Sequence, residues 1–178
     1  MNNTSKTALS ALSVALGTVF MFLSSAIPTL EYAVPAAAGF VVLFVQAEIN
    51  KSWAAGVYAA TSLLGVLLVP NKEAMGMYIA LFGLYPLLKS FFDKLPKAIS
   101  YVVKSLFFVT VTLGAYFIMI KLFGVAAEIL EDLNKITLPL LVLAGLVAFI
   151  IYDRAMMLIE RLYINRYHKY VARLFKRK

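Results

Sequence analysis

The chain has 178 residues, of which 62% are hydrophobic and only 15% are charged, and its formal net charge at pH 7 is +8. Soluble domains are about half apolar and about a quarter charged, so this composition excludes an ordinary soluble domain. There is no cysteine and only one histidine, His168, which excludes disulfides, thiol nucleophiles and a multi-histidine metal site within one chain.

The hydrophobic residues are concentrated in long runs that predict membrane-spanning helices. Runs of about 18–20 apolar residues are long enough to cross a bilayer. Helices must carry these spans, because the bilayer core offers no water to exposed backbone groups, and the runs do not alternate as barrel strands do. In chain order the expected spans are residues 7–27, 32–50, 52–69, 74–92, 97–123 and 137–162.

The predicted fold class is therefore an all-α polytopic membrane protein, with a six-transmembrane-helix bundle in residues 1–162 and a basic cytoplasmic tail in residues 163–178. Pro86 interrupts the fourth span, and a proline inside a helix removes one hydrogen bond and favours a kink. We expect that kink between Tyr85 and Lys89. The boundary between the second and third spans is the least marked, because only residues 48–51 separate them.

The distribution of Lys and Arg predicts the orientation of the bundle. With the N-terminus inside, the outer side carries only Lys72, Lys121 and Lys135, and all other basic residues lie inside. This bias predicts that both termini are cytoplasmic, and it accounts for most of the positive charge without nucleic acid. Residues 161–178 interleave basic with aromatic and aliphatic side chains, a pattern typical of an amphipathic helix on anionic lipids of the inner leaflet; partner binding is the alternative.

Small residues line two strips of the first span. Ala11 and Ala15 are four residues apart and so share one helix face, and Ser13 and Gly17 form a second strip. Small residues at this spacing let helix backbones approach closely in lipid. The spacing leaves two interpretations open: packing within this bundle, or docking of another subunit.

An AxxxA motif on the first helix of a small six-span protein resembles the substrate-binding S components of energy-coupling factor (ECF) vitamin transporters. The resemblance covers the first four spans and includes Gly39 and residues 53–57, 67–70 and 82–86. It implies that the face with Ala11 and Ala15 docks on a transmembrane coupling subunit that carries two ATPases. No GxxxxGK[ST] pattern occurs, which fits ATP hydrolysis by a partner and a chain that is not itself an enzyme.

The resemblance also implies a ligand site for a small water-soluble nutrient in the outer half of the bundle, under the loop at residues 26–32, in a bacterial cell membrane. The candidate ligand contacts, which bring charged, amide or aromatic groups to this half, are Glu31, Tyr32, Lys72, Tyr78, Tyr116, Lys121 and Asn134. For the tyrosines, anchoring at the membrane interface is the alternative. The family's metal-transporting branch uses an N-terminal histidine site, which is missing here, so neither a metal nor a cofactor is expected.

Charged residues near the inner ends of the spans form a second candidate site. They are Glu48, Lys89, Lys104, Asp153 and Arg154. Charges at membrane depth cost several kcal/mol, of order 3 on insertion scales, unless they are paired or hydrated. Three interpretations stay open: snorkelling to the headgroups, a structural ion-pair network, and a functional site such as a lipid-headgroup site or an ion path. For a transporter, such a network would hold the cytoplasmic side shut.

Two other functions remain as alternatives. One is a structural scaffold with the architecture of the cell-shape membrane protein MreD, which has similar length and span number. The other is a lipid-handling membrane protein that uses the inner charges, although no HExxH or GxSxG pattern accompanies them.

Overall fold

The computed structural model describes residues 2–123, 137–163 and 165, and the described elements are all helical. This confirms the predicted all-α class. The elements are α1 (Asn3–Ala26), the 3₁₀ turn η1 (Pro28–Leu30), α2 (Ala33–Glu48), α3 (Lys51–Leu68), α4 (Lys72–Met77), the π-helix η2 (Tyr78–Phe82), α5 (Tyr85–Phe92), α6 (Lys97–Phe123) and α8 (Thr137–Leu162). The predicted basic tail lies almost entirely outside the described residues.

Five helical segments of the described chain are long and apolar enough to cross a membrane. They are Asn3–Ala26, Lys51–Leu68, Lys72–Phe92, Lys97–Ala115 and Val142–Leu162. The second predicted span appears as α2, which is apolar but has only 16 residues. At 1.5 Å per residue this helix is about 24 Å long, shorter than a hydrocarbon core of about 30 Å. The length criterion therefore selects five segments, where six spans were predicted.

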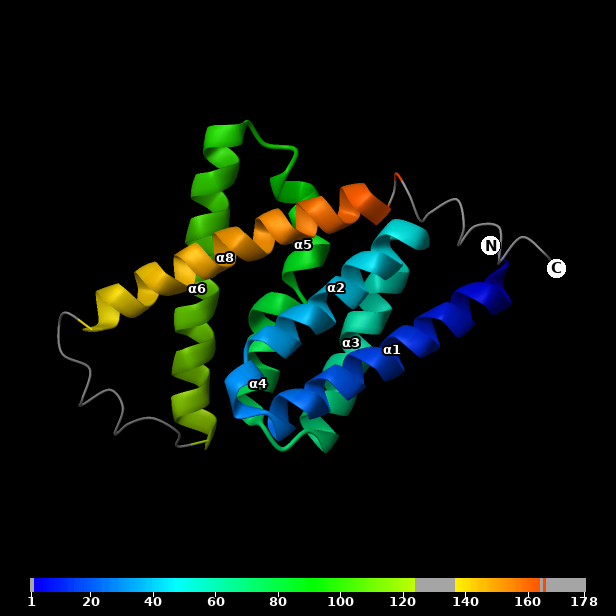
Figure 1. Ribbon diagram of the computed structural model, residues 1–178, viewed down its shortest axis with the longest axis horizontal. Coiled ribbons are helices and arrows are strands. Elements are labelled where there is room, and N and C mark those ends of the chain that lie inside the picture. The colour runs from blue at the N-terminus through cyan, green and yellow to red at the C-terminus, as the bar shows by residue number, and fades with distance from the viewer. Residues whose placement is uncertain (1, 124–136, 164, 166–178) are drawn as a thin grey trace.

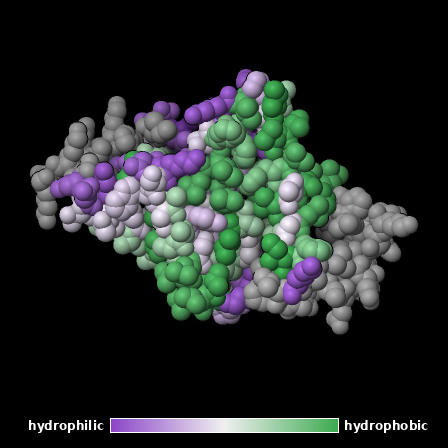
Figure 2. Space-filling model, turned by 180° about the vertical axis from the view of Figure 1, so that it is seen from behind, coloured by the Kyte–Doolittle hydropathy of each residue, from purple (hydrophilic) through white to green (hydrophobic). Residues whose placement is uncertain are grey.

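The helical segments from α1 to α6 run in alternating directions, whereas α8 lies across α6; the start of α1 and the end of α8 lie on the same side of the molecule (Figure 1). α1, α2 and α3 pack against one another, and α8 contacts α2 and α6. In Figure 1, α6 crosses α8 steeply. Figure 2 shows a face on which hydrophobic side chains cover a broad central area, with hydrophilic ones gathered toward its edges.

Side-chain caps fix the helix ends where polar residues interrupt the apolar runs. The side chain of Asn50 accepts a hydrogen bond from Trp53 N at 3.0 Å, and that of Asn71 accepts one from Ala74 N at 2.9 Å. Such N-caps satisfy donors that a helix start leaves unpaired. The ammonium group of Lys72 donates to two carbonyls of the last turn of α3, at 2.8 Å each. The short breaks between α2, α3 and α4 are therefore specified locally.

The fourth predicted span is interrupted before Pro86, one turn earlier than expected. Gly83 N donates to Tyr78 O at 2.7 Å, the i to i+5 bond of a π-helix, which leaves the carbonyl of Ile79 free for Tyr58 Oη at 2.7 Å. Proline has no N–H for the carbonyl four residues before it, that of Phe82, and this oxygen accepts from Tyr152 Oη at 3.1 Å. Tyrosines from α3 and α8 thus satisfy the two carbonyls that the irregular turn releases.

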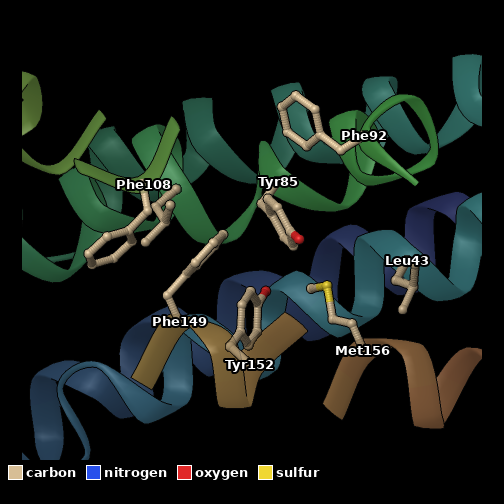
Figure 3. Packing of buried hydrophobic residues seen from close by; sticks show 8 residues of the cluster. Leu43, Tyr85, Phe92, Phe108, Phe149, Tyr152 and Met156 are labelled. Carbon is tan, nitrogen blue, oxygen red and sulfur yellow. The ribbon is translucent and has the colours of Figure 1, made fainter. Parts of the chain in front are cut away.

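A buried aromatic cluster fills the space between α2, α5, α6 and α8 (Figure 3). The Tyr85 ring lies 4.9 Å from that of Phe149 and 6.1 Å from that of Tyr152, between centroids. Gly39 of α2 lies against the same region, and a Cβ there would overlap both Phe82 O and the hydroxyl of Tyr152. The absence of a side chain at Gly39 therefore lets α2 approach the irregular turn.

We expect Gly39→Ala to destabilise the protein by about 1–3 kcal/mol, because the added methyl group must displace backbone rather than a flexible side chain. Gly56→Ala is the matched control, since a Cβ at Gly56 would meet no atom within 4 Å beyond the neighbouring residues and the backbone of its own helix, and alanine favours a helix by about 1 kcal/mol over glycine. Thermal unfolding in detergent measures both, and equal midpoints for the two variants would contradict the close approach at Gly39.

A double-mutant cycle tests the pairing of the Phe82 carbonyl. Tyr152→Phe leaves this buried acceptor without its donor, at a cost of about 1–3 kcal/mol. Pro86→Ala supplies a backbone N–H that can reach the same carbonyl. We therefore expect Tyr152→Phe to cost clearly less in the Pro86→Ala background, and strictly additive unfolding free energies would show that the two donors do not compete for this oxygen.

Candidate functional site

Ionised side chains from one end of α5, α6 and α8 form a buried group, here called the charge cluster. Its members are Lys89, Asp93, Lys104, Asp153 and Glu160, with the hydroxyl of Tyr85. Lys89 and Asp93 are four residues apart at the end of α5, and Asp153 and Glu160 are seven apart on α8. The members of each pair therefore lie on one face of their helix. Lys104, two turns into α6, contacts Asp93 from the first pair and Asp153 from the second.

Asp93 bridges the two lysines with its two oxygens. Oδ2 lies 2.7 Å from Lys89 Nζ, and Oδ1 lies 2.5 Å from Lys104 Nζ. Lys104 also donates to both oxygens of Asp153, at 3.0 and 3.1 Å, and Lys89 reaches Glu160 at 3.2 Å. The Tyr85 hydroxyl donates to Asp153. The three helices are thus joined through one continuous network.

The cluster has a buried centre and a partly open rim. The side chains of Lys104 and Asp153 are each 6% exposed, whereas those of Asp93 and Glu160 are 32% and 34% exposed. Removing two charges from water costs several kcal/mol per ion, of order 20 in the idealised limit, and good geometry with further hydrogen bonds must offset it. Tyr85 and Asp93 supply such bonds to the central pair of Lys104 and Asp153, so the loss of one partner alone would leave the other charge poorly compensated.

Asp93, at the C-cap of α5, has a pKa below its ordinary range. Burial alone raises the pKa of this carboxyl, but the hydrogen bonds from Lys104 and Lys89 outweigh that effect. A carboxyl whose pKa is depressed on folding contributes stability above its unfolded pKa and loses it as the pH falls through the lower folded value. The bridge between the two lysines therefore persists into acidic conditions.

Three of the five predicted inner charges come together in the cluster, and two do not. Lys89, Lys104 and Asp153 are members. Glu48 instead accepts a hydrogen bond from the hydroxyl of Tyr163. Arg154 has no ion pair with a described member of the cluster, is exposed, and lies against Tyr101 of α6.

Three members of the cluster were missed from the sequence. Asp93 falls between the predicted spans 74–92 and 97–123, yet its spacing from Lys89 is that of a helical ion pair. Glu160 is two turns from Asp153, and that spacing was the available signal. Tyr85 carried no signal of its own, because only the fold shows that its hydroxyl reaches Asp153.

At the opposite end, hydrogen bonds join the turn between α1 and α2 to the start of α4. The hydroxyl of Tyr32 donates to Glu73 at 2.5 Å, and the side-chain amide of Asn71 donates to Glu31. The backbone N–H of Asn71 also reaches Ser25 Oγ at 3.3 Å. Two of the predicted ligand contacts, Glu31 and Tyr32, thus have partners in the neighbouring turn.

The other predicted ligand contacts are dispersed. Lys72 caps α3, and Lys121 is exposed at the end of α6, 5.0 Å from the centroid of the Phe117 ring. Tyr116 lies on α6, but its side chain lies outside the described part, as does Asn134. Tyr78 is fully buried on η2. The structure therefore does not bring the predicted set together around one cavity.

The buried hydroxyls of Tyr78 and Thr61 lack well-formed hydrogen bonds within the described residues. The hydroxyls of Tyr78 and Thr61 are close enough to interact, yet within the described residues neither has a hydrogen bond of normal geometry. Both side chains are 0% exposed. Nearby, the Tyr58 ring centroid lies 6.1 Å from that of Tyr78. This small polar group lies between α3 and η2, inside otherwise apolar packing.

The two small-residue strips of α1 have different surroundings. Ser13 and Gly17 are buried, and a Cβ at Gly17 would lie 3.1 Å from Thr61 Cγ2 of α3. Ala11 and Ala15 are exposed. Internal packing therefore uses the strip with Ser13 and Gly17, and the AxxxA face is not covered by the described residues.

The described residues contain no group of three or more His, Cys, Asp or Glu side chains placed to hold a metal ion. Comparisons of the chain with protein-family models, curated proteins and solved structures find no match.

We expect Lys104→Met to destabilise the protein by about 3–5 kcal/mol, because it leaves Asp153 buried without a counter-charge. The double variant Lys104→Met/Asp153→Leu should recover much of this loss, since it removes both buried charges. Lys121→Met, an exposed lysine on the same helix, is the control. Chemical denaturation in detergent measures all three, and a Lys104→Met variant as stable as the control would point to snorkelling instead of a network.

Proposed function

We propose that this chain is the membrane-embedded, substrate-binding subunit of an ATP-driven importer, of the kind represented by the S components of ECF transporters. It would capture a small water-soluble nutrient outside the cell and deliver it through a coupling subunit with two ATPases. The observation that carries the proposal is the exposed AxxxA face of α1, which the described chain does not use for its own packing.

The proposal includes six spans with both termini inside. The alternating directions of the segments from α1 to α6 support it, provided that α2 counts as a short span, and the position of the end of α8 on the same side as the start of α1 fits it. A short span is accommodated by local thinning of the bilayer or by flanking residues that snorkel, at a modest cost, about a fraction of a kcal/mol per Å. In this topology the α1–α2 turn lies at the outer face of the membrane, and the charge cluster lies near its cytoplasmic face.

The small residues of α1 support docking in a specific way. Ser13 and Gly17 allow α1 to pack closely on α3. The internal packing of α1 therefore does not require Ala11 and Ala15. Ala11 and Ala15 offer a second, unused face on which another helix can approach equally closely. A helix surrounded only by lipid has no need of two such strips, because large apolar side chains serve as well there.

The ligand site is proposed in the outer half, near Tyr78 and Thr61. Buried hydroxyls without a hydrogen bond of good geometry cost up to about 1–3 kcal/mol each, and a polar ligand that donated to or accepted from them would reduce that cost. Entry requires the α1–α2 turn to move, which breaks the bonds of Tyr32 and Asn71 to their partners. The charge cluster would keep the inner ends of α5, α6 and α8 together during this opening.

Affinity purification from the native host in mild detergent, followed by mass spectrometry, tests the proposal. We expect a transmembrane coupling subunit and two ATPases to accompany the wild-type chain. Ala11→Trp and Ala15→Trp should lose them, because the indole prevents close helix approach. Leu143→Trp, at an exposed position of α8, is the matched control and should retain them.

Two results would overturn the proposal. One is a wild-type chain that co-purifies with no ATPase under conditions that preserve known membrane complexes. The other is unchanged partner recovery in both α1 variants. Recovery of cell-wall machinery in place of ATPases would favour the scaffold function.

A further inference from the structure

Arg154 is a cation exposed on the surface of α8. It is exposed between Ile151 and Leu158, which are 64% and 59% exposed. Within the described residues no carboxylate lies at ion-pair distance from it, and the nearby carboxylates of the charge cluster are already engaged with Lys89 and Lys104. An unpaired charge on an apolar, lipid-facing surface is costly, so the position calls for an anion from outside the chain.

Within the described residues, Arg154 contacts Tyr101 of α6. Its guanidinium donates to the hydroxyl of Tyr101, and its Cζ lies 5.6 Å from the centroid of that ring. Tyr101 is one turn from the start of α6, at the depth where aromatic and basic side chains meet lipid headgroups. Lys97, exposed and four residues earlier on the same helix face, adds a second cation at this end.

A shallow, largely open groove of about 450 Å³ begins at Tyr101 and follows the outer face of α6, which supplies all of its lining residues. Its lining is almost entirely apolar: Tyr101, Val102, Ser105, Leu106 and Val109. Val102 and Leu106 are 67% and 64% exposed. The lining residues span about 12 Å along the helix axis, which is room for part of an acyl chain. A water-soluble anion would gain nothing from this surface.

We propose that Arg154, Tyr101 and this groove form a binding site for one anionic phospholipid. The lipid phosphate accepts charge-assisted hydrogen bonds from the Arg154 guanidinium, and the Tyr101 hydroxyl holds the guanidinium in place. One acyl chain lies in the groove beyond Ser105. The site is distinct from the basic tail and goes beyond the proposed function, because it assigns a lipid rather than a nutrient.

Lipid titration of the purified full chain in nonionic detergent tests the site, with thermal unfolding and native mass spectrometry as readouts. We expect dioleoyl phosphatidylglycerol to raise the unfolding midpoint more than dioleoyl phosphatidylcholine does. Arg154→Gln should weaken retention of the anionic lipid by about tenfold, the loss of one charge-assisted hydrogen bond. Lys51→Gln, an exposed cation at the start of α3, is the charge-matched control and should behave as wild type.

A second variant probes the groove without touching the cation. Ser105→Trp fills the middle of the groove, so it should also reduce the preference for phosphatidylglycerol while Arg154 remains in place. Equal effects of the two lipids on the wild type, or an unchanged preference in both Arg154→Gln and Ser105→Trp, would overturn the site. Inorganic phosphate alone should not raise the midpoint; if it reproduced the whole effect, Arg154 would bind free phosphate and the lipid assignment would be wrong.

Discussion

The arrangement of this protein depends on the need to pair every backbone polar group inside an apolar interior. Pro86 cannot donate to the carbonyl of Phe82, and the preceding π-turn releases the carbonyl of Ile79. In a bilayer each orphaned group would cost several kcal/mol, about 2–7 by transfer scales. Tyr152 and Tyr58 answer these two needs. Because those tyrosines come from α8 and α3, the irregular turn fixes where two other helices must lie.

The same turn positions the charge cluster. α5 begins at Tyr85, after the π-helix, so its residues do not continue the regular helical spacing of α4. Tyr85 and Lys89, one turn apart, then face Asp153 and Glu160 of α8. Tyr152, which pairs with the irregular turn, immediately precedes Asp153. Two successive residues of α8 therefore have different partners. Tyr152 donates to the carbonyl of Phe82, which the helix leaves unpaired, and Asp153 pairs with the buried Lys104.

The positions of the helices could be predicted because long apolar runs and polar interruptions are local properties of the chain. The all-α class and the approximate helix positions followed from them. An ion-pair network that includes Asp153 and Lys104 was one of the open interpretations, because isolated charges at membrane depth are costly. Asp93 was missed because a residue at a helix end has the composition of a loop, and only the approach of α6 makes it a bridge.

Other features depended on tertiary contacts that no local pattern contains. A proline distorts the turn before it, so the irregularity lies at residues 78–84 and not after Tyr85. The spacing of small residues on α1 could not tell which strip faces inward; the close contact of Gly17 with Thr61 decides that. The candidate ligand residues were chosen by side-chain type and expected depth in the membrane. Neither property predicts which side chains lie close together in the fold.

The two ends of the bundle are fastened with different strength. At the end with the α1–α2 turn, the bonds join exposed or half-buried groups, such as Tyr32 with Glu73, and exposed polar contacts contribute little, about 0–1 kcal/mol for ion pairs. At the other end, opening would separate Lys104 from Asp153 inside an apolar core, at a cost of about 3–5 kcal/mol by analogy with buried pairs. We therefore expect a fluctuation that opens the molecule to occur more readily at the α1–α2 end. In the proposed topology that end faces outward, the side on which the proposed importer would receive its nutrient.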